Sequence, residues 1–228
     1  MVYGHHQYKR TPLHPQEKEV DIHHLLWSTL VMAGLKSFLL AVAPMLNVTS
    51  AALYERQRAL VALGALKSAP GRGPGSGVPL TAENFAAILI SVLATENLSD
   101  VDKRVVSLIN AAPVRVNIND YSREWGKTKA QVLVDAVSSV LSGKKLKFPA
   151  PDGNIFDMPI TAIRITRYGR AQLLVNRSTD IEYKSKWSSL QRQPPPISIT
   201  AEIEGKSLGN LIAFTQGALS QTAEGDDE

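Results

Sequence analysis

Apolar residues in the first part of the chain recur every three or four positions, the spacing that lines one face of a helix. This spacing predicts helices at residues 15 to about 33, about 35–46, 50–64, 81 to about 94, 99–112 and 128–141. Thr49 or Ser50, and later Thr81, stand where a hydroxyl can accept a hydrogen bond from an unpaired first-turn N–H. Gly64 is suited to the left-handed conformation that ends a helix. The chain is therefore expected to be mainly helical up to about residue 112.

From Lys144 onward the apolar period changes to two, which is the alternation of a strand with one buried face. Strands are predicted at residues 145–148, 160–167, 171–175 and 197–203, after a short one at 114–118. Tyr168-Gly169-Arg170 is expected to join two of them as a tight hairpin. A last helix from Ser207 to about Leu219 is expected to close the fold. These elements predict an α+β protein with an antiparallel sheet in its C-terminal part.

Residues 35–81 are predicted to run in the order helix, turn, second helix and glycine-rich loop. The second helix is expected to turn Leu53, Leu60 and Leu63 inward. Its polar residues are expected to face outward: Tyr54, Arg56, Gln57 and Arg58. The loop at 67–77 contains the basic residues Lys67 and Arg72 and almost no side chain able to join a core. The order fits a nucleic-acid-binding segment, and also a plain surface hairpin followed by a flexible loop.

This segment resembles the winged helix-turn-helix transcription regulators. Leu63-Gly64-Ala65-Leu66 stands where MarR-like proteins end their recognition helix, and Val78-Pro79-Leu80-Thr81 stands where the second wing strand leads into the next helix. Tyr54-Glu55-Arg56 is similar to MerR-like proteins, although the helix here runs on through Ala59-Leu60-Val61. The resemblance covers roughly a quarter of the chain. It implies a winged helix-turn-helix DNA-binding domain at residues 1–112, followed by an α+β domain with an antiparallel sheet at 113–228.

The resemblance also implies which residues would contact DNA. They lie at the start and along the outer face of the second helix and in the loop: Thr49, Ser50, Tyr54, Arg56, Gln57, Arg58, Lys67 and Arg72. A helix can enter the major groove, about 12 Å wide, while a wing reaches the flanking phosphates or the minor groove. The expected function is therefore a sequence-specific double-stranded DNA-binding transcription regulator. It is expected to act as a homodimer, with residues 113–228 mediating dimerisation or binding a protein partner.

Two other functions remain open. The formal net charge is +4, but residues 144–193 hold ten Lys or Arg against four Asp or Glu, and the last five residues are acidic and expected to be disordered. A basic surface of this kind suits a polyanion. The chain could thus be a phage-like DNA-packaging or replication-initiation component with a second nucleic-acid surface. A structural or adaptor protein that binds no DNA is the other alternative.

Catalytic and metal chemistry find little support in the sequence. The chain has no cysteine, and all five histidines lie in the first 24 residues without the spacing of a metal site. Gly205-Lys206-Ser207 ends like a phosphate-binding loop, but Thr200 replaces the required glycine. We expect no enzyme activity, no metal and no cofactor. Lys36 interrupts the apolar stretch 25–46 and no secretion signal is evident, so we expect a cytoplasmic protein without a membrane span.

Overall fold

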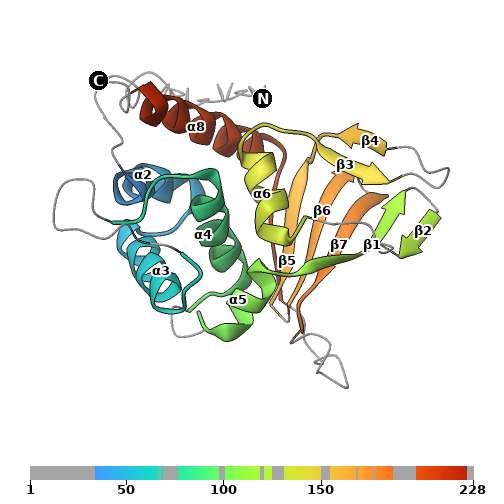
Figure 1. The fold of residues 1–228 in the computed structure, drawn as a ribbon, viewed down its shortest axis with the longest axis horizontal. Coiled ribbons are helices and arrows are strands. Elements are labelled where there is room, and N and C mark those ends of the chain that lie inside the picture. Colours follow the sequence, from blue (N-terminus) through green and yellow to red (C-terminus); the bar gives the residue numbers. More distant parts are fainter. Residues whose placement is uncertain are drawn as a thin grey trace, which may run out of the picture. The chain divides into compact units, whose positions relative to one another are not determined.

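The computed structural model describes residues 34–66, 68, 77–97, 101–118, 121–124, 131–149, 155–167, 169–176, 178–186 and 199–224. The predicted first helix, Lys67, Arg72, Tyr168 and residues 225–228 of the acidic tail lie outside these residues, whereas Glu224 is the last residue of a helix. Residues Met32–Glu228 form one compact unit. Its described part is a mixed α+β fold in which helices pack on one antiparallel sheet (Figure 1).

The helices come first along the chain and return at its end. They are α2 (Leu35–Val42), the short 3₁₀ helix η1 (Ala43–Leu46), α3 (Ser50–Ala62), α4 (Ala82–Ala94), α5 (Lys103–Ile109), α6 (Leu133–Leu141) and α8 (Gly205–Glu224). Helix α2 ends at Val42 and is followed directly by η1, whose second residue, Pro44, cannot donate an N–H to a continuing α-helix. The strands are β1 (Ala112–Ile118), β2 (Tyr121–Glu124), β3 (Leu146–Pro149), β4 (Ile155–Met158), β5 (Ala162–Thr166), β6 (Arg170–Asn176), β7 (Thr179–Lys184) and β8 (Thr200–Glu204).

The main sheet has the order β2-β1-β7-β6-β5-β8, and β3 pairs with β4 in a separate hairpin. All the described pairings are antiparallel. Strand residues alternate between two faces, and the apolar ones, such as Ile163, Ile165 and Leu173, are fully buried against the helices. Residues of the opposite face are mostly polar, with Ala162 and Leu174 as apolar members. The sheet therefore has one core face and one polar face.

Helix α4 lies at the centre of the core. Its residues from Phe85 to Ser91 are all buried, and it packs against α3, α5 and α6 as well as β5 and β8. Phe85 also meets Phe38 of α2 edge to face at 4.7 Å between ring centroids, and Phe38 lies 5.4 Å from Phe214 of α8. Elements on both sides of residue 112, the expected domain border, thus share one hydrophobic core.

Several local predictions are confirmed. Thr49 Oγ1 accepts a hydrogen bond from the Ala52 amide at 3.1 Å, and Thr81 Oγ1 accepts one from the Asn84 amide at 3.0 Å, so both residues cap the helices that follow them. Gly64 has φ +72, and its neighbour Ala65 donates to the Leu60 carbonyl at 2.9 Å, which is the pattern of a glycine-terminated helix.

Other boundaries differ from the predictions. Helix α6 begins at Leu133 rather than at Thr128, and the Leu133 amide donates to the Ala111 carbonyl at 2.9 Å, which ties this point of the chain to the end of α5. Strand β7 was not predicted, because between Thr179 and Lys184 only Ile181 and Tyr183 are apolar. Yet β7 lies in the middle of the sheet, where Ile181 and Tyr183 are almost completely buried.

Candidate nucleic-acid interface

The segment from α2 to α3 forms a tight helix-turn-helix in the plain geometric sense. Asn47, which follows η1, has φ +52 and ψ +41, a left-handed conformation that asparagine tolerates better than most residues. The Val48 amide donates to the Ala43 carbonyl at 3.2 Å, and Thr49 is extended before it caps α3. These features turn the chain within a few residues. Helices α2 and α3 then pack against each other and onto α4.

The buried face of helix α3 contains one charged and one polar side chain beside its leucines. Leu53 and Leu60 are fully buried as predicted, but Arg56 and Gln57 lie between them with exposed fractions of only 4% and 8%. The expectation that Arg56 and Gln57 face outward is therefore wrong. Residues 53, 56, 57 and 60 are spaced as one helical face, so a helix that buries the two leucines also turns the two polar residues inward. Gln57 Oε1 has no hydrogen-bond partner within the described part of the chain.

The Arg56 guanidinium binds the C-terminal end of α4. Its Nη1 donates to the Ser91 carbonyl at 2.9 Å and to Thr95 Oγ1, and its Nη2 donates to the carbonyls of Thr95 at 2.9 Å and Glu96 at 3.1 Å. The last carbonyls of a helix lack intrahelical partners and carry partial negative charge. The last turn of α4 contains no basic residue of its own. Arg56 supplies that positive charge from the neighbouring helix.

The outward face of α3 is small and mixed in character. Its exposed residues are Ala51, Tyr54, Glu55, Arg58 and Ala62. Arg58 Nη1 lies 3.0 Å from Glu55 Oε1 in an ion pair whose side chains are 65% and 46% exposed. Lys36 Nζ of α2 stands 5.0 Å from the centre of the Tyr54 ring, within range of a cation–π interaction. Lys36 and Arg58 therefore add positive charge beside Tyr54, while Glu55 offsets part of it.

The predicted DNA-contacting residues thus fall into three groups. Thr49, Ser50, Tyr54 and Arg58 lie at the start or on the outward face of α3, although Ser50 is half-buried and Thr49 Oγ1 is used as a cap. Arg56 and Gln57 point into the protein. The two loop residues fall outside the described ranges. Lys36 and Glu55 were missed; the three-residue spacing of Glu55 and Arg58 could have identified that pair, whereas Lys36 reaches Tyr54 only through packing of α2 on α3.

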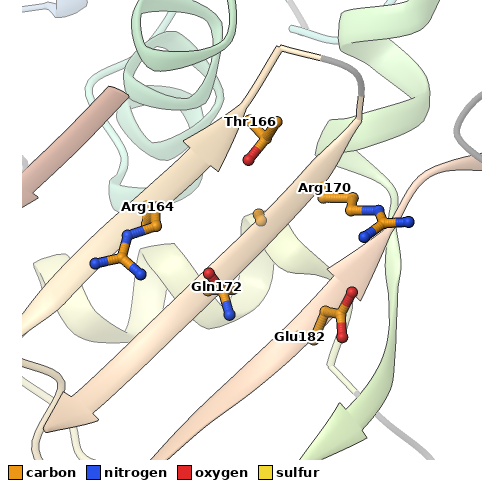
Figure 2. Close-up of a pocket in the computed structure, with 6 residues that line it drawn as sticks. Arg164, Thr166, Arg170, Gln172 and Glu182 are labelled. Atoms are coloured by element: carbon orange, nitrogen blue, oxygen red, sulfur yellow. The ribbon is translucent and has the colours of Figure 1, made fainter. Parts of the chain in front are cut away.

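The polar face of the sheet is a second surface with chemistry to consider. Arg164 forms a two-pronged ion pair with Glu202, and hydrogen bonding to Glu202 raises the pKa of Arg164 above its ordinary value. Asp180, 9% exposed, accepts hydrogen bonds from Asn117 Nδ2 at 3.0 Å and Gln172 Nε2 at 3.1 Å. A shallow hollow of about 250 Å³ lies between β5, β6 and β7 (Figure 2). Arg164 and Arg170 point in opposite directions there, so their guanidinium groups do not converge on one anion.

The charges of this polar face are nearly balanced. The strand register places on it, among the described residues, Arg115, Arg164, Arg170 and Lys184 together with Glu124, Asp180, Glu182, Glu202 and Glu204. Arg167, just beyond β5, forms an ion pair with Glu96. The excess of basic residues at 144–193 in the sequence therefore does not gather into one positive surface on the sheet, because acidic residues from other segments lie beside them.

The chain has no match among protein-family models, curated proteins or solved structures. None of the helices in the described ranges combines the length and apolar character needed to cross a membrane. Within the same ranges, no three histidine or acidic side chains come together as a metal site.

Proposed function

We propose that the chain binds double-stranded DNA in a sequence-specific manner and regulates transcription, with α3 as the helix that enters the major groove. The observation that supports this most directly is the way α3 is held. Leu53, Arg56 and Leu60 fix one face to the core, so Tyr54 and Arg58 are displayed on the other face of a rigid element. Sites on rigid helices are positioned more accurately than sites on loops.

Each group at this surface has a chemical role in the proposed complex. The first N–H groups of α3, near the Thr49 cap, carry partial positive charge and suit a DNA phosphate. Arg58 can leave its exposed pair with Glu55 at small cost and donate two hydrogen bonds to guanine. Tyr54 offers an apolar ring for a thymine methyl group and a hydroxyl for the backbone.

Selection from a random double-stranded pool followed by a binding titration tests this function. The wild-type chain is expected to enrich a preferred sequence and to bind it with an affinity that falls as salt rises. Replacement of Arg58 by Ala is expected to weaken binding to that sequence by about 1–3 kcal/mol. Absence of any DNA retention at low salt would contradict the proposal.

An adaptor role without DNA is the second candidate, favoured by one observation. Leu40 of α2 and Met45 of η1 are large apolar residues with exposed fractions of 62% and 37%, on the same helix-turn-helix as α3. Exposed apolar residues can mark a protein-binding surface, and Leu40 is the more exposed of the two. Leu40→Ser is expected to leave DNA binding unchanged under the DNA-binding proposal. Under the adaptor alternative, the wild-type chain would retain no DNA in the same titration.

The nucleic-acid-packaging alternative requires a second basic surface. Lys144, Lys145 and Lys147 are exposed after α6 and along β3, and they are the densest run of lysines in the described residues of the 144–193 stretch. Replacement of all three by Gln is expected to change non-specific DNA affinity little if α3 is the main contact. A large loss on this triple replacement, larger than that of Arg58→Ala, would favour the packaging or replication-initiation function.

We also propose that the regulator acts as a homodimer, because a two-fold assembly doubles the number of base contacts. Light scattering of the full chain at micromolar concentration is the measurement, and a monomeric mass would contradict the proposal. A fragment that ends at residue 112 is not a suitable comparison, since α4 packs on α6, β5 and β8, and such a fragment would lack all three.

A further inference from the structure

Arg56 is buried, and both terminal nitrogens of its guanidinium donate hydrogen bonds to the C-terminal end of α4. It donates to three backbone carbonyls and one hydroxyl, all between Ser91 and Glu96 at the end of α4. Thr95 Oγ1 itself donates to the Ser91 carbonyl at 3.0 Å, which holds the hydroxyl in place. A planar guanidinium can satisfy this fork of acceptors, and the single ammonium of lysine cannot do so in the same way.

The same connection continues beyond α4. Glu96, whose carbonyl accepts from Arg56, uses its carboxylate to pair with Arg167 at the end of β5. The Arg167 amide in turn donates to the Ile199 carbonyl at 3.0 Å, next to the first residue of β8. Helix α3 is thus joined through Arg56 and Glu96 to the edge of the sheet. The orientation of α3 on the rest of the protein is therefore fixed by hydrogen bonds as well as by apolar packing.

The direction of Arg56 determines which residues α3 can present. With 3.6 residues per turn, an inward position 56 places positions 51, 54, 55, 58 and 62 outward. A rotation of α3 by one residue, about 100°, would bring Glu55 toward the core and Arg56 outward. Burial of Leu53 and Leu60 opposes such a rotation but does not fix the rotation angle of α3, because apolar contacts are non-directional. The directed hydrogen bonds of Arg56 fix the rotation angle of α3.

We propose that Arg56 is a positioning residue for sequence readout: it sets the rotation and crossing of α3 on α4 and so controls which base edges Tyr54 and Arg58 reach, without touching DNA. This inference rests on the proposed DNA-binding function. It assigns to Arg56 a role opposite to that of an ordinary basic residue on a recognition helix. An arginine that contacts phosphate adds affinity for every sequence, whereas a positioning arginine adds affinity mainly for the correct one.

The comparison of Arg56→Gln with Arg58→Gln tests the inference, because both remove one positive charge from the same helix. The probes are a duplex selected by the wild-type chain and a scrambled duplex of equal length, each titrated at several salt concentrations. Arg56→Gln is expected to reduce the ratio of selected to scrambled affinity about tenfold and to leave the salt dependence unchanged. Arg58→Gln, which removes the proposed guanine contact, is expected to weaken binding to the selected duplex and to relax the preference at one base pair only. Arg56→Lys is expected to recover part of the lost ratio.

The affinity ratio and one further variant separate positioning from general destabilisation. A merely structural loss lowers the active fraction and weakens both duplexes equally, so it leaves the affinity ratio unchanged. Thr95→Val, which removes one acceptor of Arg56 and keeps its charge, is expected to lower the ratio by a smaller factor and serves if Arg56→Gln does not fold. A reduced salt slope in Arg56→Gln, or an unchanged ratio in both Arg56→Gln and Thr95→Val, would overturn the inference. Failure of the wild-type chain to bind either duplex would instead overturn the proposed function itself, and the inference with it.

Discussion

Arg164 of β5 and Glu202 of β8 lie directly opposite each other and bind through two parallel hydrogen bonds, Nε to Oε2 at 2.8 Å and Nη2 to Oε1 at 3.2 Å. Their side chains are 37% and 26% exposed, so solvent screens the pair. Glu202→Gln is expected to lower the free energy of unfolding by less than about 1 kcal/mol, and the loss should shrink at high salt. Urea unfolding at low and high salt measures it. Glu55→Gln, which breaks a more exposed pair, is the control and should cost less.

Removal of the Glu55 carboxylate is expected to strengthen DNA binding. Glu55 holds Arg58 in an ion pair and adds a negative charge to the proposed interface. Since an exposed pair of this kind contributes roughly 0.2–1 kcal/mol, its removal should raise affinity by up to about fivefold. Titration of a selected duplex measures the change. Glu83→Gln makes the same change in charge on α4 and should raise DNA affinity less. Equal increases in affinity would mean that the outward face of α3 is not the DNA interface.

The two helix caps should separate stability from DNA binding. Thr49 and Thr81 each accept one first-turn amide hydrogen bond, at 3.1 Å and 3.0 Å, so replacement of either by Ala is expected to cost about 1 kcal/mol of unfolding free energy. Only Thr49 stands at the start of α3. Thr49→Ala should therefore weaken DNA binding beyond its effect on stability, whereas Thr81→Ala should not. Thermal melting and DNA titration of the two variants decide this, and a similar loss of binding in both would contradict it.

Gly143 and Gly64 share the same backbone conformation, with φ +72, but differ in their surroundings. A Cβ at Gly64 would meet open space, so Gly64→Ala should cost only the left-handed strain, about 1–2 kcal/mol. A Cβ at Gly143 would collide with the amide of Gln216, which donates to the Ser142 carbonyl at 3.0 Å. Gly143→Ala is thus expected to cost about 1 kcal/mol more than Gly64→Ala, through loss of that hydrogen bond. If Gln216→Ala does not remove this difference, the explanation is wrong.

Tyr183 should make the fold sensitive to alkali. Burial, with a smaller contribution from the charge of Asp135, raises the pKa of Tyr183 above its ordinary value, near 10. The phenolate is therefore favoured in the unfolded chain, so stability from this residue is complete below about pH 10 and is lost as pH rises further. One such group changes the free energy of unfolding by at most about 1.4 kcal/mol per pH unit. Urea unfolding from pH 9 to 11 should show a flatter profile for Tyr183→Phe; identical profiles would exclude this role.

Local signals in the sequence were sufficient for several features of the fold. The caps at Thr49 and Thr81 and the stop at Gly64 depend on neighbouring residues, and the structure confirms all three. The antiparallel pairing of β5 with β6 is also local, since the two strands are joined by a short turn. In each case the sequence next to the element contains the partner of the interaction.

The direction of Arg56 and the position of β7 depend on distant parts of the chain. An arginine among outward-facing residues is ordinarily predicted to be solvated, and its acceptors at Ser91 to Glu96 become visible only when α3 packs on α4. Strand β7 has few apolar residues, but its neighbours β1 and β6 form hydrogen bonds with both of its edges. The local offset of the positive excess at 144–193 is likewise visible only in the fold, because Glu202 and Glu96 approach Arg164 and Arg167 from other segments.

The contact of Phe38 with Phe214 has a consequence for how the protein is made. Synthesis proceeds from the N-terminus, so α2 and α3 leave the ribosome long before α8 does. Until α8 arrives, Phe38 lacks one of its aromatic neighbours and the core around α4 also lacks β8. Contacts between such distant residues are slow to form. The helix proposed to read DNA would therefore rest on a complete core only after α8 has been synthesised, about 150 residues after α3 itself.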